Sequence, residues 1–346
     1  MATIKDVAKK AGVSIGVVSR AFNNYPDISE ETKKRIFEVA KELNYTPNIV
    51  ARNLSMKKQM TIGLITSGIL DSSPKDSNNS LEIFKGVYTG TQEKNYELAI
   101  YLIDSQKQRG KKYVQFCRER NIGGAILQGI RTDDPYLQEL VEANIPCVLI
   151  DAALDTDEDY IGFVSTDNVA AIREVALHLL ENNHRDIVVV AGKKEAYVDE
   201  WRLQGVREAF REFGFTLSAD KIIYGDYTEQ GAYEAAKILL QNMQPTAFLC
   251  FSDLMALGVM KAVEEAGLAV PNDISVTGFD GLIITEYTQP PLTTVWQNFF
   301  EIGRQAANLL IQLMEKKETE RHILVNHELI KRGSVARLEK DRKEEE

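Results

Sequence analysis

The sequence predicts an α plus α/β protein, in which a small all-helical head precedes a larger body of two doubly wound α/β lobes. Apolar residues recur at helical spacing over residues 1–46. From residue 61 onward, short β-branched runs alternate with amphipathic stretches, as in parallel sheets covered by helices. Residues 1–58 carry 11 Lys/Arg and 6 Asp/Glu, and the other residues carry 30 and 45. A basic head therefore precedes an acidic body.

Composition narrows the class of protein. The 346 residues are 27% charged and 44% hydrophobic, ordinary values for a globular chain of two or three domains. No apolar run reaches the ~18 residues that span a bilayer, and the first residues do not resemble a signal peptide, so we expect a cytoplasmic protein. Cys117, Cys147 and Cys250 are far apart and lack metal-ligand spacing, which predicts reduced thiols in the core.

The head shows two short helices joined by a tight turn. Thr3 can cap the first helix and Ser14 the second, and Gly12 between them can take the positive φ that ends a helix. Ser29 can cap a third helix. Two helices within about twenty residues indicate a helix-turn-helix, although three short helices alone also fit an unrelated small bundle.

The sequence of the body predicts two successive series of βαβ units. Strands are expected at 61–66, 97–103, 124–129, 146–150, 186–191, 222–224, 246–251 and 274–279. Helices are expected at 81–95, 114–120, 135–143, 168–182, 199–213, 228–241 and 253–266. Two lobes in tandem form a cleft between them, a favoured place for a small ligand.

Known catalytic signatures are missing from the sequence. It contains no GxGxxG, Walker A loop, GxSxG elbow or HExxH motif. Convincing metal spacing is also lacking among the histidines, which are His178, His184, His322 and His327. We therefore expect no enzymatic activity, no cofactor and no metal.

Several phrases carry a family resemblance. In the head they are TIKDVAKKAGVS, VSRAFNN, ISEETKKRI and ELNYTPN, and in the body NNHRDI, EWRLQG, SDLMALG, VPNDISVTGFD and PPLTTV. In this order they resemble the lactose-repressor (LacI/GalR) family over nearly the full chain. The resemblance implies a DNA-binding transcriptional regulator whose lobes are of periplasmic-binding-protein type.

The resemblance implies that the second helix lies in the major groove. Its implied DNA contacts, with those of the first helix, are Thr3, Ser14, Ile15, Gly16, Val17, Ser19, Arg20 and Asn23. The family usually has polar or small residues at positions 15 to 17, whereas this chain has Ile15, Gly16 and Val17. Ile15 cannot form a hydrogen bond and Gly16 has no side chain, so direct readout should be thin, although Gly16 also fits drift at a tolerant surface position. We expect Arg20 and DNA shape to carry more of the specificity.

Residues 47–58 resemble the family's hinge, which becomes helical on operator DNA. Leu54 matches the apolar wedge that enters the minor groove and bends the duplex. Asn48, Ala51 and Arg52 match the positions that flank it. A short isolated helix is unstable in water, so the body could control DNA affinity through the folding of this hinge.

The resemblance also implies a ligand set between the lobes. It comprises Asp151, Arg202, Tyr227, Ser252, Asp253 and Asp280. Arginine donors and carboxylate acceptors suit paired hydroxyl groups. Other readings remain open, since Asp253 can cap a helix and Tyr227 can be an ordinary half-buried aromatic residue. Ser252 replaces the family's usual asparagine, and Trp201 fits either ring stacking on a sugar or core packing.

The predicted domain boundaries follow from these segments. They are a head at 1–46, a hinge at 47–58, an effector domain at 59–333 and a disordered tail at 334–346. Within the effector domain, the N-terminal lobe is expected at 60–163 plus 293–320 and the C-terminal lobe at 164–290 plus 321–333. The polar segment 70–80 is expected to reshape the cleft mouth.

These features predict a homodimeric repressor of a carbohydrate-utilisation operon, with a tetramer also open. Two identical heads fit a pseudo-palindromic operator, and a sugar bound between the lobes would release it. Three alternatives remain: control by a small-molecule corepressor, control by a protein such as a phosphorylated carrier, and a sugar-binding transport protein. The basic head and the lack of a signal peptide disfavour the transport protein.

Overall fold

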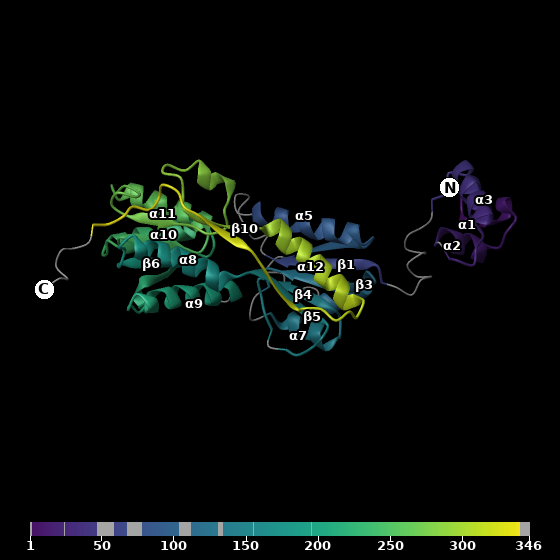
Figure 1. Ribbon diagram of the computed structural model, residues 1–346, viewed down its shortest axis with the longest axis horizontal. Coiled ribbons are helices and arrows are strands. Elements are labelled where there is room, and N and C mark those ends of the chain that lie inside the picture. Colours follow the sequence, from purple (N-terminus) through teal and green to yellow (C-terminus); the bar gives the residue numbers. More distant parts are fainter. Residues whose placement is uncertain are drawn as a thin grey trace. The chain divides into compact units, whose positions relative to one another are not determined.

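The computed structural model describes residues 2–23, 25–46, 59–67, 78–103, 112–130, 134–154, 156–194 and 196–339. Contacts divide the chain into two units, Met1–Met60 and Thr61–Glu346 (Figure 1). The first unit covers the residues of the predicted head and hinge, and the second covers nearly all of the predicted effector domain. The hinge residues Asn48, Ala51, Arg52 and Leu54 lie outside the described residues, as does most of segment 70–80.

The head consists of helices α1 (Ile4–Ala11), α2 (Ile15–Phe22) and α3 (Glu30–Glu42). The side chains of Ser14 and Ser29 accept hydrogen bonds from the third residue after each of them, so both predicted caps are confirmed. Gly12 takes a φ of 67°, which ends α1 as expected. At the start of α1, the Asp6 carboxylate accepts from the backbone N–H and the hydroxyl of Thr3, both at 2.8 Å.

One apolar cluster holds the three head helices together. Its fully or nearly buried members are Val7, Ala8, Ala11, Val18, Ala21, Ile28, Ile36 and Ala40. All of them except Ile28 fall on the apolar faces that helical spacing defines. The opposite face of α2 is left open to solvent, which is the requirement for a helix that contacts a partner.

The N-terminal lobe is built on a six-stranded parallel sheet in the order β11-β5-β4-β3-β1-β2. Its strands are β1 (Thr61–Ser67), β2 (Glu97–Ile103), β3 (Ile122–Gln128), β4 (Cys147–Ile150), β5 (Ile161–Thr166) and β11 (His322–Val325). Its helices are α5 (Asn78–Glu93), α6 (Tyr113–Glu119), α7 (Pro135–Glu142) and α12 (Phe299–Met314). Helices α5 and α12 cover one face, and α7 lies on the other (Figure 1).

The C-terminal lobe is built on a four-stranded parallel sheet in the order β7-β6-β8-β9. Its strands are β6 (Ile187–Ala191), β7 (Ile222–Tyr224), β8 (Ala247–Cys250) and β9 (Ser275–Thr277). Its helices are α8 (Asn168–Glu181), α9 (Tyr197–Glu212), α10 (Glu229–Leu240) and α11 (Asp253–Glu265). The pairs α8–α9 and α10–α11 lie on opposite faces (Figure 1). Both lobes are thus doubly wound, as predicted.

Residues 322–330 form two strands that belong to different sheets. His322–Val325 pairs with β5 in the N-terminal sheet, whereas β12 (His327–Ile330) pairs antiparallel with β10 (Thr294–Gln297) in a separate two-stranded sheet. Residues 321–325 therefore belong with the N-terminal lobe rather than the C-terminal one, and β5 extends that lobe to residue 166. The residue types along 322–330 suit one continuous strand. The two halves differ only in the strand with which each one pairs.

The predicted tail begins too early. The Ser334 hydroxyl donates to the carbonyl of Val276 at 2.6 Å and accepts from the N–H of Thr293 at 2.8 Å. Ala336 follows in contact with the same lobe, since its carbonyl lies 2.9 Å from His184 Nε2. Hydrogen bonding to the body therefore orders a polar segment that composition alone assigns to disorder. Residues 340–346 lie outside the described residues.

Two glycines allow α5 and α12 to pack at close range. A Cβ atom on Gly86 would lie 2.0 Å from the carbonyl oxygen of Phe300, and one on Gly303 would lie 2.2 Å from that of Ile83. Each glycine thus faces the backbone of the other helix. This contact fixes α12, the helix between β10 and β11, to the N-terminal lobe.

Candidate nucleic-acid interface and inter-lobe site

Helix α2 presents one face to solvent. Ser14, Ile15, Gly16 and Arg20 are exposed, and Thr3 is exposed at the start of α1. Val17, Ser19 and Asn23 are half-buried. The predicted contact residues described in the head therefore lie on or beside one accessible surface, with Ile15 and Gly16 contributing no side-chain hydrogen bond.

Arg20 is held by a partner that the sequence interpretation did not include. Its Nη1 atom lies 2.5 Å from Oδ2 of Asp27, in the turn that leads to α3. Both side chains are about half exposed. Seven residues separate the two, so neither helical spacing nor a short turn motif pointed to the pair.

A chain of hydrogen bonds connects the two lobes. Asp151 follows β4, and its Oδ1 accepts from the hydroxyl of Ser165 at 2.6 Å. The amide of Asn168, at the start of α8, donates to the same hydroxyl at 2.9 Å. Arg202 on α9 then donates from Nε to Oδ1 of Asn168 at 2.8 Å. One polar network thus runs from the end of a strand in the N-terminal lobe to a helix in the C-terminal lobe.

Three contacts hold the guanidinium of Arg202. Besides Asn168, it donates to the carbonyl of Phe251, and its Cζ lies 3.8 Å from the centroid of the Phe279 ring. The residue is 4% exposed. A buried cation needs such partners, because an unpaired one would be strongly destabilising.

Tyr227 is oriented by two residues that the sequence interpretation missed. Its hydroxyl donates to Oδ1 of Asp199, and its ring occupies the space that a side chain at residue 192 would fill. A Cβ on Gly192 would lie 2.0 Å from this ring. Asp199 lies in the first turn of α9, three residues before Arg202. This spacing places both residues on one face of the helix and could have indicated Asp199 from the sequence.

The acidic residues Asp253 and Asp280 have different surroundings. Asp253 is fully buried and accepts from the N–H of Leu282 at 2.7 Å and from the hydroxyl of Thr294 at 2.5 Å. Asp280 is half-buried and accepts from Nε2 of Gln297 at 2.8 Å. Ser252 caps α11 by accepting from Met255 N–H, so the cap proposed for Asp253 belongs to its neighbour.

Burial raises the pKa of several groups in this cluster. It raises the pKa of Asp151 and of Asp199, with Arg202 acting in the opposite direction on both. It raises the pKa of Asp253 well above its ordinary value, and the nearby charge of Asp280 adds to the shift. The Tyr227 pKa is also raised well above its usual range by burial. Such concentrated shifts are typical of functional sites.

The predicted ligand residues therefore lie in one cluster, in two layers. Asp151, Tyr227 and Asp280 are half-buried and form the more accessible layer. Arg202, Ser252 and Asp253 are buried. Trp201 is half-buried, with its ring 6.4 Å from that of Tyr197. The accessible layer offers acceptors and one aromatic face, a combination that suits a ligand rich in hydroxyl groups.

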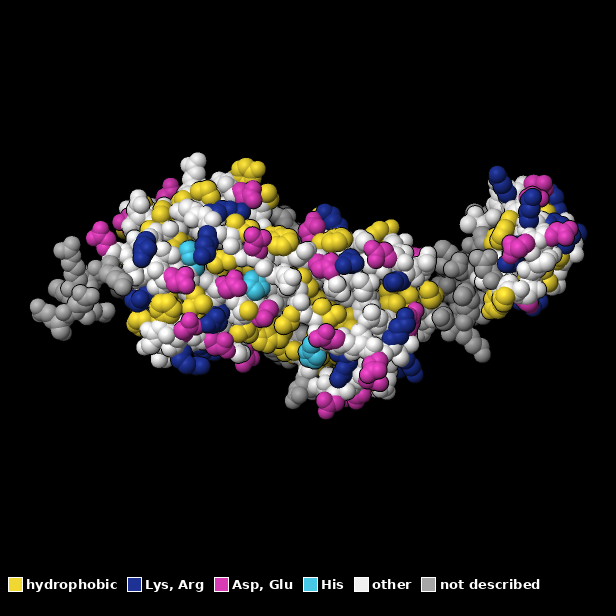
Figure 2. Space-filling model, viewed as in Figure 1, with side chains coloured by type: hydrophobic (Ala, Val, Ile, Leu, Met, Phe, Trp, Pro, Cys, Tyr) yellow, Lys and Arg dark blue, Asp and Glu magenta, His cyan; other side chains and the backbone are white. Residues whose placement is uncertain are grey.

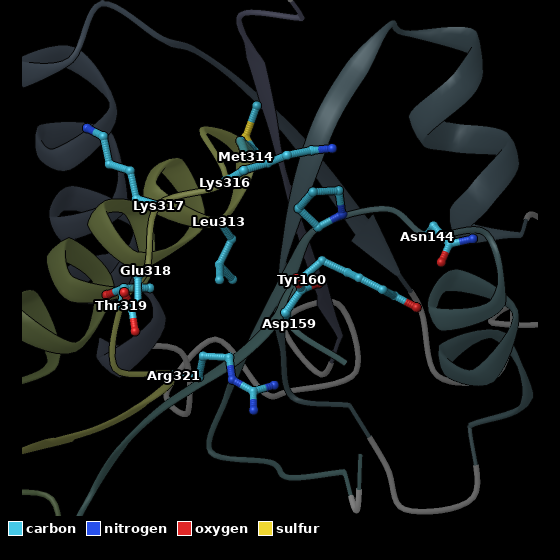
Figure 3. A pocket seen from close by; sticks show the side chains of 11 residues that line it. Asn144, Asp159, Tyr160, Leu313, Met314, Lys316, Lys317, Glu318, Thr319 and Arg321 are labelled. Atoms are coloured by element: carbon cyan, nitrogen blue, oxygen red, sulfur yellow. The ribbon is translucent and has the colours of Figure 1, made fainter. Parts of the chain in front are cut away.

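A separate pocket of about 570 Å³ lies at the opposite edge of the N-terminal sheet. Figure 3 shows that the end of α12 and the segment after it form one wall, and that Asn144, Asp159 and Tyr160 form the other. Lys317 and Arg321 in its lining are already paired, with the Glu315 carboxylate and the Glu158 carbonyl. It contains none of the predicted site residues.

Within the described part of the chain, no three His, Cys, Asp or Glu residues are grouped to hold a metal ion. No helix there is long and apolar enough to cross a membrane. Figure 2 shows acidic and basic side chains interspersed over the visible face of the body.

A head with an exposed helix-turn-helix face and a two-lobed α/β body define a ligand-responsive DNA-binding regulator. Residues 3–48 match the family model of bacterial regulatory proteins of the lacI family, and residues 176–335 match that of the periplasmic binding protein-like domain. The probable HTH-type transcriptional repressor ExuR of Bacillus subtilis (strain 168) is 34% identical over 98% of this chain and 99% of its own length. The chain belongs to the LacI family of transcriptional repressors.

Two solved structures are similar in fold over nearly the whole chain. A Lac repressor dimer, bound to operator and the anti-inducer ONPF, has a TM-score of 0.84 and 26% identity, covering 97% of this chain and 99% of that one. A complex of the transcriptional regulator CelR with cellobiose has a TM-score of 0.72 and 28% identity, covering 96% and 100%.

Proposed function

We propose that this protein is a homodimeric repressor of a carbohydrate-utilisation operon, released from a pseudo-palindromic operator by a sugar. The observation that carries the proposal is the inter-lobe cluster. Its more exposed residues, Asp151, Tyr227 and Asp280, can accept hydrogen bonds or stack, and buried Arg202 fixes the Asn168 side chain, whose amide donates to Ser165 in the other lobe. The cellobiose bound by the similar regulator CelR supports a carbohydrate as the ligand class.

The coupling to DNA would act through the lobes. A sugar that bridges Asp151 of one lobe and Tyr227 of the other changes the angle between them, and with it the hinge at residues 47–58. Leu54 of the hinge is the proposed minor-groove wedge. We expect Leu54→Ala to weaken specific binding while leaving the salt-dependent, nonspecific binding nearly intact. An equal loss on random DNA contradicts the wedge role.

An exposed apolar surface supports the homodimer. Leu81 and Tyr88 on α5 and Ile100 and Leu102 on the adjacent edge strand β2 are all at least 40% exposed. Large exposed apolar side chains on an edge strand favour pairing with another chain. The Lac repressor of similar fold is described as a dimer.

The proposal is tested with the full-length protein and DNA selected by it from a random pool. Operator binding is titrated by fluorescence anisotropy against neutral mono- and disaccharides, amino sugars and uronates. We expect one class to weaken operator binding at least tenfold. Tighter binding with sugar would instead show a corepressor. Binding of a phosphorylated carrier protein, with no response to any sugar in anisotropy or calorimetry, would replace the effector model with a protein-partner model.

A further inference from the structure

The guanidinium of Arg20 has one of its edges occupied before DNA arrives. Arg20 stands in the last turn of α2, on the face with Ile15 and Gly16, and its Nη1 is 2.5 Å from Oδ2 of Asp27. An arginine presents five N–H donors in a planar fork. With Nη1 held by Asp27, the Nε–H and Nη2–H groups form a second pair of parallel donors on the same guanidinium.

We propose that Asp27 is a specificity-determining residue for DNA recognition, which positions Arg20 to read a guanine. The N7 and O6 atoms of guanine accept two parallel hydrogen bonds in the major groove, which is the commonest specific contact of arginine with DNA. A carboxylate that fixes the guanidinium plane selects the orientation in which both bonds form together. Asp27 acts through Arg20, and is therefore a positioning residue.

The other exposed residues of α2 offer few hydrogen-bond donors to DNA, so the orientation of Arg20 matters for base recognition. Ile15 has only a hydrocarbon side chain, Gly16 has none, and the Ser14 hydroxyl oxygen accepts from the N–H of Val17. Arg20 is thus the long donor side chain on the exposed face of α2. An unrestrained arginine there would bind phosphates of any sequence, because phosphate contacts carry no base information.

The charge of Asp27 acts in the same direction. A half-exposed carboxylate beside the recognition helix repels the phosphate backbone, and it lowers the affinity for all sequences alike. At a site with guanine opposite Arg20, the two hydrogen bonds that the base accepts from the oriented guanidinium offset this repulsion. Asp27 therefore raises the ratio of specific to nonspecific binding, although its charge weakens binding to DNA in general.

The test uses full-length wild type, Asp27→Asn, Arg20→Ala and the double variant. Each protein selects binding sites from a random duplex pool, and affinities for the selected and a random duplex are measured over a range of salt concentrations. Asp27→Asn should lower the preference for guanine at one position by about tenfold. It should also tighten random-DNA binding about threefold and steepen the salt dependence by about one counterion.

Two controls separate the proposal from a general charge effect. Glu42→Gln removes one carboxylate that pairs with Lys10 at 2.7 Å elsewhere in the head, and it should leave the base preference unchanged. In the Arg20→Ala background, Asp27→Asn should no longer alter base preference. The proposal fails if Asp27→Asn keeps the guanine preference of wild type, if Glu42→Gln relaxes it equally, or if Asp27→Asn relaxes it without Arg20. Circular dichroism melting confirms that each head remains folded.

Discussion

At the scale of single residues, the inter-lobe cluster depends on Arg202, because one guanidinium satisfies Asn168, the Phe251 carbonyl and the Phe279 ring. Because Arg202 is buried, it supports the structure around the site in addition to any contact that it makes with ligand. We infer that it fixes the positions of α8 and α11 relative to each other and holds the accessible residues in place. Removal should therefore affect stability and effector response together.

We expect Arg202→Ala to lower the free energy of unfolding by about 3 kcal/mol, because it leaves buried acceptors without their donor. Operator binding below the melting temperature should persist, while the effector response is lost. Urea denaturation and anisotropy measure the two effects. The control is Arg207→Ala, at an exposed position of the same helix, which should change stability by no more than about 0.5 kcal/mol. Normal induction of the Arg202 variant by the same sugar would remove it from the site.

Asp151 should show the pH dependence of a half-buried carboxyl group whose pKa is raised by its loss of contact with water. Burial raises its pKa in the folded chain above the ordinary value of 3.8, so the fold prefers the protonated form. The carboxyl thus destabilises the fold increasingly as the pH rises from about 4 through the shifted pKa. Asp151→Asn keeps an acceptor for Ser165, and asparagine tolerates the positive φ of 55°.

Asp151→Asn should therefore raise the melting temperature by about 1–2 °C at pH 7, with the gain vanishing toward pH 4. Scanning calorimetry across this pH range measures the difference between variant and wild type. A gain that grows on acidification would contradict the assigned direction of the pKa shift. Effector affinity should fall in the variant, because a charged acceptor has been replaced by a neutral one.

At the scale of elements, glycines of two kinds occur within helices. A Cβ on Gly16 of α2 would meet only the Ser14 Oγ, at 3.8 Å, whereas those on Gly86 and Gly303 would overlap backbone atoms. Gly16 destabilises α2, although no neighbouring atom requires a glycine at this position. The other two allow α5 and α12 to approach.

The same substitution should consequently have opposite effects at these positions. Gly16→Ala should stabilise the head by about 0.5–1 kcal/mol, because it reduces the conformational freedom of the unfolded chain. Gly303→Ala should destabilise the body by about 1–3 kcal/mol through overpacking against Ile83. Chemical denaturation followed by circular dichroism measures both changes. Stabilisation by Gly303→Ala would show that the helices separate readily.

At the scale of the whole molecule, the proposed dimer couples two heads on one operator. Ile100→Asp places a charge in the exposed apolar surface of α5 and β2 and should dissociate the dimer. Loss of the second head should weaken operator binding by about a hundredfold, because simultaneous engagement supplies avidity. Analytical ultracentrifugation and anisotropy measure the two effects. Ile238→Asp, at an exposed position on α10, is the matched control; a dimeric Ile100 variant would place the interface elsewhere.

Local rules of sequence were sufficient for the head and for most of the body. Ser14, Ser29 and Gly12 act within a few residues of their positions in the chain, so caps and helix ends could be predicted from spacing alone. Each βαβ unit is likewise local. The family phrases EWRLQG and VPNDISVTGFD also led to the prediction of Arg202 and Asp280 as ligand residues, which stays a prediction.

Tertiary structure decided whatever depends on residues distant in the chain. It divided 322–330 between two sheets, ordered Ser334 against Val276, and paired Arg20 with Asp27 and Tyr227 with Asp199. The physical reason is that hydrogen-bond partners and burial are set by where the chain returns, and no local spacing records that return. The sequence by itself thus determined the elements and the class of the protein. The folded chain determined which side chains are free to meet DNA or ligand and which are held by others.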